Sequence, residues 1–77
     1  MNLNLKGETT MIKSNLKELL HSRDISIREF SRRIGYRYES VRQLYQGNND
    51  RIPVPLVERI CKELNCDVGD LFTYIPS

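Results

Sequence analysis

The sequence predicts an all-α fold, a single domain of five short helices, and three observations lead to this prediction. Apolar residues recur at helical spacing in separate stretches of the 77-residue chain. Residues that favour helix ends, among them serine, aspartate, proline and glycine, stand between these stretches. The segment IREFSRRIGYRYESVRQLYQ, residues 27–46, fits two helices joined through one glycine.

The first helix is predicted to begin at Ser14 or Asn15. Leu16, Leu19 and Leu20 then lie on one face of that helix, where they can enter the core.

The second helix is predicted to begin with a capping box at Ser26-Ile-Arg-Glu29. In a capping box the serine hydroxyl accepts a hydrogen bond from the glutamate amide, and the glutamate side chain reaches back to the serine amide. Ile25 and Phe30 stand at the positions of a hydrophobic staple. Gly35 is expected to end this helix, because glycine tolerates the positive φ of a tight turn.

The third helix is predicted at about 38–46, with Gly47 closing it. On a wheel of about 100° per residue, Val41, Leu44 and Tyr45 face the body of the domain. The opposite face carries Glu39, Arg42, Gln43 and Gln46.

A fourth helix is predicted after residue 53. Pro55 suits its first turn, where a missing amide donor has no cost. Val57, Ile60, Cys61 and Leu64 then follow the spacing of a core-facing stripe.

A short fifth helix is predicted at 68–72, marked by Asp67 and Asp70, with Cys66 and Leu71 as a second staple. Two apolar segments remain outside the helices, LNLKGETTMI near the N-terminus and FTYIPS at the C-terminus. We expect them to pair as short strands, to make a dimer contact, or to cover their own core.

Composition excludes several classes of protein. The chain is 39% hydrophobic and 29% charged, as is ordinary for a soluble globular domain. No apolar run approaches the roughly 20 residues of a membrane span, and residues 1–10 lack the features of a signal peptide. We therefore expect a cytoplasmic protein whose domain spans 11–77, preceded by an extension or disordered tail at 1–10.

Charge is concentrated in the middle of the chain. Residues 23–51 hold seven arginines against four acidic residues, 7 − 4 = +3, and residues 52–77 hold two basic against four acidic residues, 2 − 4 = −2. Arginine pairs well with phosphate and with guanine. Such a run is often only a solvated helical face, but here it coincides with the two-helix segment, which favours nucleic-acid binding.

Metal and enzyme chemistry have little support in the sequence. Cys61 and Cys66 are five residues apart, which is not a zinc-ligand spacing, and His21 is the only histidine. No nucleophile motif surrounds any of them. We expect reduced thiols, no metal, no cofactor and no enzymatic activity.

With these residues in view, the chain resembles the lambda-repressor-like helix-turn-helix proteins, the XRE or Cro/repressor type, from about Met11 to Ser77. Three segments carry the resemblance in the order and spacing of that family: NLKELL, SIREFSRRIGYRYESVRQLYQGN and RIPVPLVERICKELNCDVGDLF. The resemblance implies transcriptional regulation through operator DNA, with helix 3 in the major groove. It also implies a repressor of phage or mobile-element type, acting in the cytoplasm near the nucleoid of a bacterial or phage-infected cell.

By family position, the side chains that reach base edges are Tyr38, Glu39, Arg42 and Gln43. Arg42 can donate two bonds to guanine, and Gln43 can pair with adenine. Glu39 can accept from cytosine or can instead orient its neighbours Arg42 and Gln43. Tyr38 can pack on a thymine methyl, bond a phosphate, or serve as a partly buried aromatic at the helix start.

Family position also indicates the residues that contact phosphates, which fix register without reading sequence. They are Ser26, Arg28, Arg37, Ser40, Gln46, Asn48 and Arg51. Arg37 departs from the Ser or Thr that often caps helix 3, and Ile27 departs from the polar residue that commonly opens helix 2. Arg32 and Arg33 are expected to face solvent.

The family usually binds palindromic double-stranded DNA as a homodimer, so we expect both here. A protein-binding regulator, such as an antitoxin or a phage modulator of another regulator, is the alternative. Tyr36, Tyr38 and Tyr45 would then be aromatic anchors of a protein interface.

Overall fold

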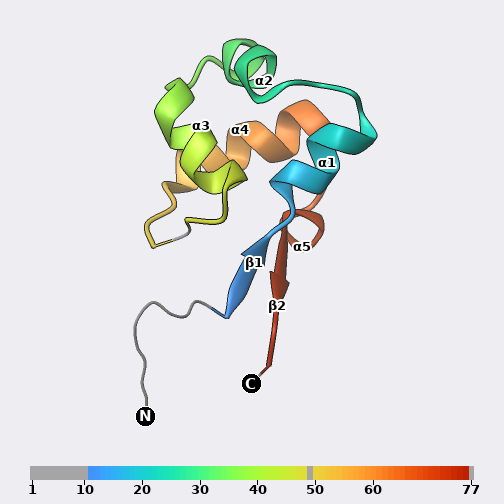
Figure 1. The fold of residues 1–77 in the computed structure, drawn as a ribbon, viewed down its shortest axis with the longest axis vertical. Helices are drawn as coiled ribbons and strands as arrows, with labels where there is room; N and C mark the ends of the chain where they lie inside the picture. The colour runs from blue at the N-terminus through green and yellow to red at the C-terminus, as the bar shows by residue number, and fades with distance from the viewer. Residues whose placement is uncertain (1–10, 49, 77) are drawn as a thin grey trace.

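A computed structural model describes residues 11–48 and 50–76, and in these ranges it holds five helices and one small sheet (Figure 1). The expected extension at 1–10 lies outside the described residues. The elements in chain order are β1 (Ile12–Ser14), α1 (Leu16–Ser22), α2 (Ile27–Ile34), α3 (Tyr38–Tyr45), α4 (Val54–Leu64), α5 (Val68–Leu71) and β2 (Phe72–Tyr74). The predicted helical fold is confirmed, with a two-stranded ribbon added to it.

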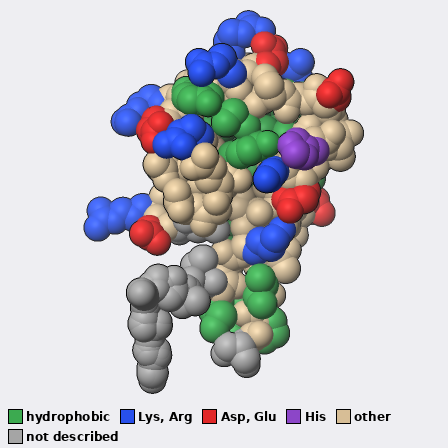
Figure 2. Space-filling view, in the orientation of Figure 1, with side chains coloured by type: hydrophobic (Ala, Val, Ile, Leu, Met, Phe, Trp, Pro, Cys, Tyr) green, Lys and Arg blue, Asp and Glu red, His purple; other side chains and the backbone are tan. Residues whose placement is uncertain are grey.

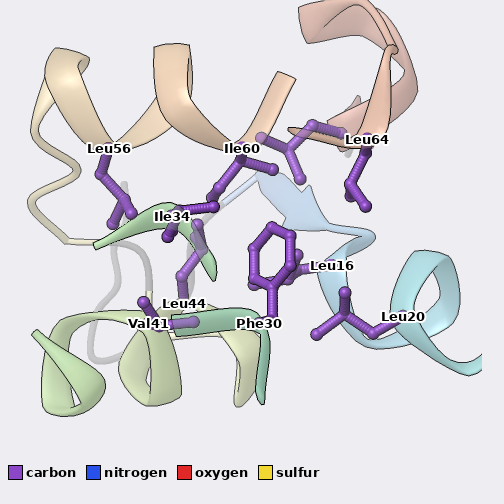
Figure 3. Packing of buried hydrophobic residues seen from close by; sticks show 10 residues of the cluster. Leu16, Leu20, Phe30, Ile34, Val41, Leu44, Leu56, Ile60 and Leu64 are labelled. Carbon is purple, nitrogen blue, oxygen red and sulfur yellow. The ribbon is translucent and has the colours of Figure 1, made fainter. Parts of the chain in front are cut away.

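The core is one cluster of ten apolar side chains, to which all five helices contribute (Figure 3). The Phe30 ring lies at its centre, with Leu16 and Leu20 of α1 on one side and Ile60 of α4 above. The other members are Ile34, Val41, Leu44, Leu56, Leu64 and Leu71. Burying one such side chain fully is worth about 1.5–3 kcal/mol, so α2 is held where α1, α3 and α4 all pack against it.

Local sequence explains where most helices begin and end. The Ser26 hydroxyl accepts a hydrogen bond of 3.1 Å from the Glu29 amide and caps α2 as predicted. The second half of the predicted capping box is wrong, because the Glu29 carboxylate accepts instead from Arg32 and Arg33. The reciprocal arrangement occurs at α5, where the side chains of Asp67 and Asp70 each accept from the other residue's backbone.

The core-facing stripe of α4 contains Ile60 and Leu64, as predicted, but begins at Leu56 and not at Val57. Leu56, Ile60 and Leu64 are the buried residues of this helix, at intervals of four. Val57 and Cys61, predicted for the core, flank the stripe and are half-buried. Both cysteines are free thiols, and burial raises the pKa of the Cys66 thiol.

β1 and β2 pair as an antiparallel ribbon that extends below the helices (Figure 1), and of the segment LNLKGETTMI only Met11 and Ile12 lie within the described residues. Ile12 faces Tyr74 and Ser14 faces Phe72 across the two strands. Phe72 packs against the core, whereas Tyr74 is 65% exposed. The segment FTYIPS therefore covers the core with its first residue and leaves apolar surface beyond it. No helix in the described ranges is long and apolar enough to cross a membrane.

Candidate nucleic-acid interface

The turn between α2 and α3 is built around Gly35, which has φ 67° and ψ 36°. Its amide donates to the Arg32 carbonyl at 3.3 Å, and the Tyr36 amide donates to the Ser31 carbonyl at 3.2 Å. Ser31 is only 6% exposed. A small side chain at this position allows the two helices to approach closely. This geometry agrees with the predicted helix-turn-helix and directs α3 away from α2.

Arg59 of α4 holds this turn from outside the helix pair. Its Nη1 donates to the carbonyls of Ile34 at 3.1 Å and Gly35 at 2.9 Å. Carbonyls at a helix C-terminus lack partners within the helix and favour a nearby cation. The guanidinium also lies 5.5 Å from the ring centre of Tyr36. No local pattern predicts this role of Arg59, because the contact joins residues 24 or more positions apart.

The outer face of α3 carries a continuous set of hydrogen-bonded side chains with Glu39 at its centre. Arg42 donates to the two carboxylate oxygens of Glu39 at 3.0 Å from Nε and 2.6 Å from Nη2. Gln43 donates to Glu39 at 2.9 Å, and Asn48 donates to Gln43 at 2.7 Å. Arg42 also donates from Nη1 to Gln46 at 2.9 Å. Five of the predicted contact residues therefore form one connected group.

Electrostatics within this group keep Glu39 ionised. Hydrogen bonds from Arg42, and then from Gln43, lower the pKa of the Glu39 carboxyl from 4.5 to about 2. The same ion pair raises the pKa of Arg42. Both side chains therefore stay charged, and the orientation of each depends on the other, throughout the physiological pH range.

The start of α2 meets the start of α3 through Arg28 and Tyr38. The Arg28 guanidinium lies 4.4 Å from the centre of the Tyr38 ring, a cation–π contact. Tyr38 is half-buried, so its aromatic ring supports a neighbour while part of it stays accessible. Ser26 precedes Arg28 and directs its hydroxyl to the first turn of α2. These three predicted residues thus lie on one side of α3.

Other predicted phosphate-contact residues lie around two hollows beside α3. Ser40, Gln43, Asn48 and Arg51 line a hollow of about 160 Å³ between α3 and the segment that leads to α4. Ser40 also lines a neighbouring hollow, of about 380 Å³, together with Arg37. Arg37 is the N-cap residue of α3, and its side chain makes no capping hydrogen bond. Its guanidinium is exposed, as is that of Arg51.

Basic side chains gather over α2 and α3, at the top and left of the molecule in Figure 2. Arg32 and Arg33 are exposed on α2, as predicted, and both pair with Glu29. Arg23 belongs to the basic stretch in sequence but donates to the Leu64 carbonyl at 3.0 Å, at the C-terminal end of α4. It therefore serves packing between α1 and α4.

The three tyrosines of the alternative, protein-binding interpretation each have a separate partner. Tyr36 lies beside Arg59, Tyr38 beside Arg28, and the Tyr45 hydroxyl is 3.0 Å from Nε2 of His21. All three are half-buried.

Comparison with known proteins agrees with this geometry. Residues 15–77 match the model of the Cro/C1-type HTH DNA-binding domain. The chain is 33% identical over 60 residues to the uncharacterized HTH-type transcriptional regulator YozG of Bacillus subtilis (strain 168), covering 78% of this chain and 71% of YozG. It is also similar to the crystal structure of the transcriptional regulator VanUg, with a TM-score of 0.72 and 27% identity over 99% of this chain and 100% of VanUg. With its helix-turn-helix and arginine-rich surface, this chain belongs to the Cro/C1-type HTH DNA-binding domain family of transcriptional regulators.

Proposed function

We propose that this protein is a sequence-specific regulator that inserts α3 into the major groove of double-stranded DNA. The observation that carries the proposal is the division of α3 into two faces. Val41 and Leu44 are buried in the core, and the opposite face bears the connected polar group around Glu39. A B-DNA major groove admits one helix, and polar side chains on its outer face can then bond base edges.

The residues around α3 support contacts with the duplex backbone. Arg28 at the start of α2 contacts Tyr38 at the start of α3, with Ser26 two residues before it, and Ser40, Asn48 and Arg51 line a hollow beside α3. Helix N-terminal amides and arginines both favour phosphate oxygens. In this arrangement Tyr38, Arg42 and Gln43 approach the bases, while the flanking residues, with Arg37 and Gln46, contact the two strands of the backbone.

A homodimer on a palindromic operator completes the proposal. One module of this size covers on the order of 600–1,000 Å² on DNA and reads only a few base pairs. Two copies related by a two-fold axis read two half-sites about 34–36 Å apart, which is one helical turn. Occupying an operator that overlaps a promoter would repress transcription, and a promoter–reporter fusion measures the sign of this effect.

Selection of duplexes from a random DNA library tests the proposal. The expected result is an enriched palindrome with two half-sites one turn apart, bound with an affinity that falls log-linearly as salt rises. Binding without base preference, or affinity that salt does not change, would contradict it. Salt-independent affinity for a protein partner instead would favour the antitoxin or modulator alternative.

A further inference from the structure

We infer that Glu39 is a positioning residue for base recognition: it holds the Arg42 guanidinium so that its terminal edge faces a guanine, and it does not read a base itself. This inference rests on the proposed function. Its physical basis is the number of donors and acceptors on the side chains of α3 that are already hydrogen-bonded within the protein, and the number that remain available for a base.

Arg42 has five N–H donors in one plane. Nε and one N–H of Nη2 point to the same side of the guanidinium, and both bond the Glu39 carboxylate, at 3.0 and 2.6 Å. Nη1 donates to Gln46 at 2.9 Å. Glu39 precedes Arg42 by three residues and Gln46 follows it by four, so the two acceptors hold the guanidinium from opposite sides.

These three bonds leave one N–H on Nη1 and one on Nη2. The free N–H of Nη2 lies on the terminal edge of the guanidinium, and the free N–H of Nη1 lies beside it when Gln46 accepts from the other N–H of Nη1. Two parallel N–H groups are what O6 and N7 of guanine accept in the major groove. The side chain of Arg42 is only 32% exposed, so its neighbours already restrict it before DNA arrives.

Gln43 is oriented by the same carboxylate. Its amide donates one N–H to Glu39 at 2.9 Å, and its oxygen accepts one bond from Asn48 at 2.7 Å. An amide has two N–H groups and two oxygen lone pairs, so one donor and one acceptor remain. That is the pair of groups that a bidentate contact with adenine requires.

Glu39 has little capacity left for a base of its own. A carboxylate offers about four acceptor positions, and Arg42 and Gln43 together use three of them. The structure thus favours the orienting role of Glu39 over the reading of cytosine. It assigns to each half-site a guanine that depends on Arg42 and an adjacent or nearby adenine that depends on Gln43.

The variant E39Q tests this role in the full chain, with E29Q as the matched control. Glu29 on α2 contacts the side chains three and four residues after it, as Glu39 does on α3. The partners of Glu29 are Arg32 and Arg33, which are exposed to solvent. Each variant removes one negative charge, so each is expected to bind random duplex DNA slightly more tightly than the wild type. Only E39Q is expected to lose base preference, because only Glu39 orients residues of α3.

The measurement is competition between the selected operator and duplexes changed at single base pairs, for the wild type, E39Q, E29Q and R42A. We expect E39Q to lose about tenfold in preference at the base pair that R42A also affects, and E29Q to keep the wild-type preference. E39D, whose shorter side chain cannot span both Arg42 and Gln43, should lose preference at the same pair. It provides a second variant should E39Q fail a thermal-unfolding check.

Two results would overturn the inference. E39Q could keep the full preference at the pair that depends on Arg42, or it could lose preference at a different pair, which would make Glu39 a direct reader. Both results can be observed only if the wild-type protein prefers one operator sequence over others. A wild-type protein that binds DNA without any preference would instead contradict the proposed function, so the two failures are distinguishable.

Discussion

Gly35 offers a quantitative test of how the helix-turn-helix is held. Its backbone is left-handed, with φ 67°, and a Cβ built on it meets Nη1 of Arg59 at 3.6 Å, an ordinary van der Waals distance. The variant G35A therefore faces a conformational cost but no steric clash. The left-handed conformation costs an L-residue about 1–2 kcal/mol, and alanine recovers about 0.4–1 kcal/mol by restricting the unfolded chain. We expect a net loss of about 1 kcal/mol in the free energy of unfolding.

Two other glycines serve as controls. Gly47 has φ 89° with no atom within 4 Å of its Cβ position, so G47A should lose a similar amount for the same conformational reason. Gly69 has equally open space and no positive φ, so G69A should gain about 0.5–1 kcal/mol, because alanine is the better helix former. The assay is urea unfolding followed by circular dichroism. Thermal midpoints should shift by about 4–8 °C per kcal/mol in a domain of this size.

The three glycine variants can refute the reasoning in either direction. If G35A is as stable as G69A, the left-handed backbone is not what requires glycine at residue 35. If G35A loses more than about 3 kcal/mol, or no longer folds, the contact with Arg59 cannot relax and the limit is steric. A folded G35A should still bind the selected operator, because Arg59 and the core keep the angle between α2 and α3.

Three further predictions concern charged residues. R59M should lower the free energy of unfolding by about 1–3 kcal/mol, because it leaves two carbonyls at the turn without their donor; an unchanged urea midpoint would argue against this contact. The lowered pKa of Glu39 should make the wild type more stable than E39Q above about pH 4.5, and this difference in stability should vanish as the pH falls to about 2. Urea midpoints across this pH range measure the difference. A difference that persists at pH 2 would exclude the ion pair between Glu39 and Arg42 as its cause. R37A and R51A should weaken binding to all duplexes alike and reduce the salt slope by about one ion each; an unaltered slope in both would remove them from the phosphate contacts.

Sequence signals were sufficient for the ends of α2 and for the two faces of α3, where the causes are local. Ser26 and Gly35 mark the limits of α2 because a hydroxyl cap and a left-handed glycine act within a few residues. The wheel of α3 separated Val41 and Leu44 from Arg42 and its neighbours, because a helix of eight residues keeps its phase.

Two local details and one long-range contact were not predicted. Glu29 has two kinds of partner within four residues, and the two arginines prevailed over the amide of Ser26. The buried stripe of α4 includes Leu56, which precedes the predicted pattern, because burial at intervals of four residues replaces the predicted positions Val57 and Cys61. The Arg59 contact with the turn depends on the packing of α4 against α2, which no local pattern encodes.

The pairing of β1 with β2 has a consequence for the order of events during translation. Ser14 is synthesised before the five helices of the described residues, and its partner Phe72 is synthesised after them. Asn15, beside it, likewise waits for the Leu71 carbonyl. The ribbon can therefore close only after residue 74 has emerged from the exit tunnel. Synthesis thus delivers α2 and α3 before it can join β1 to β2.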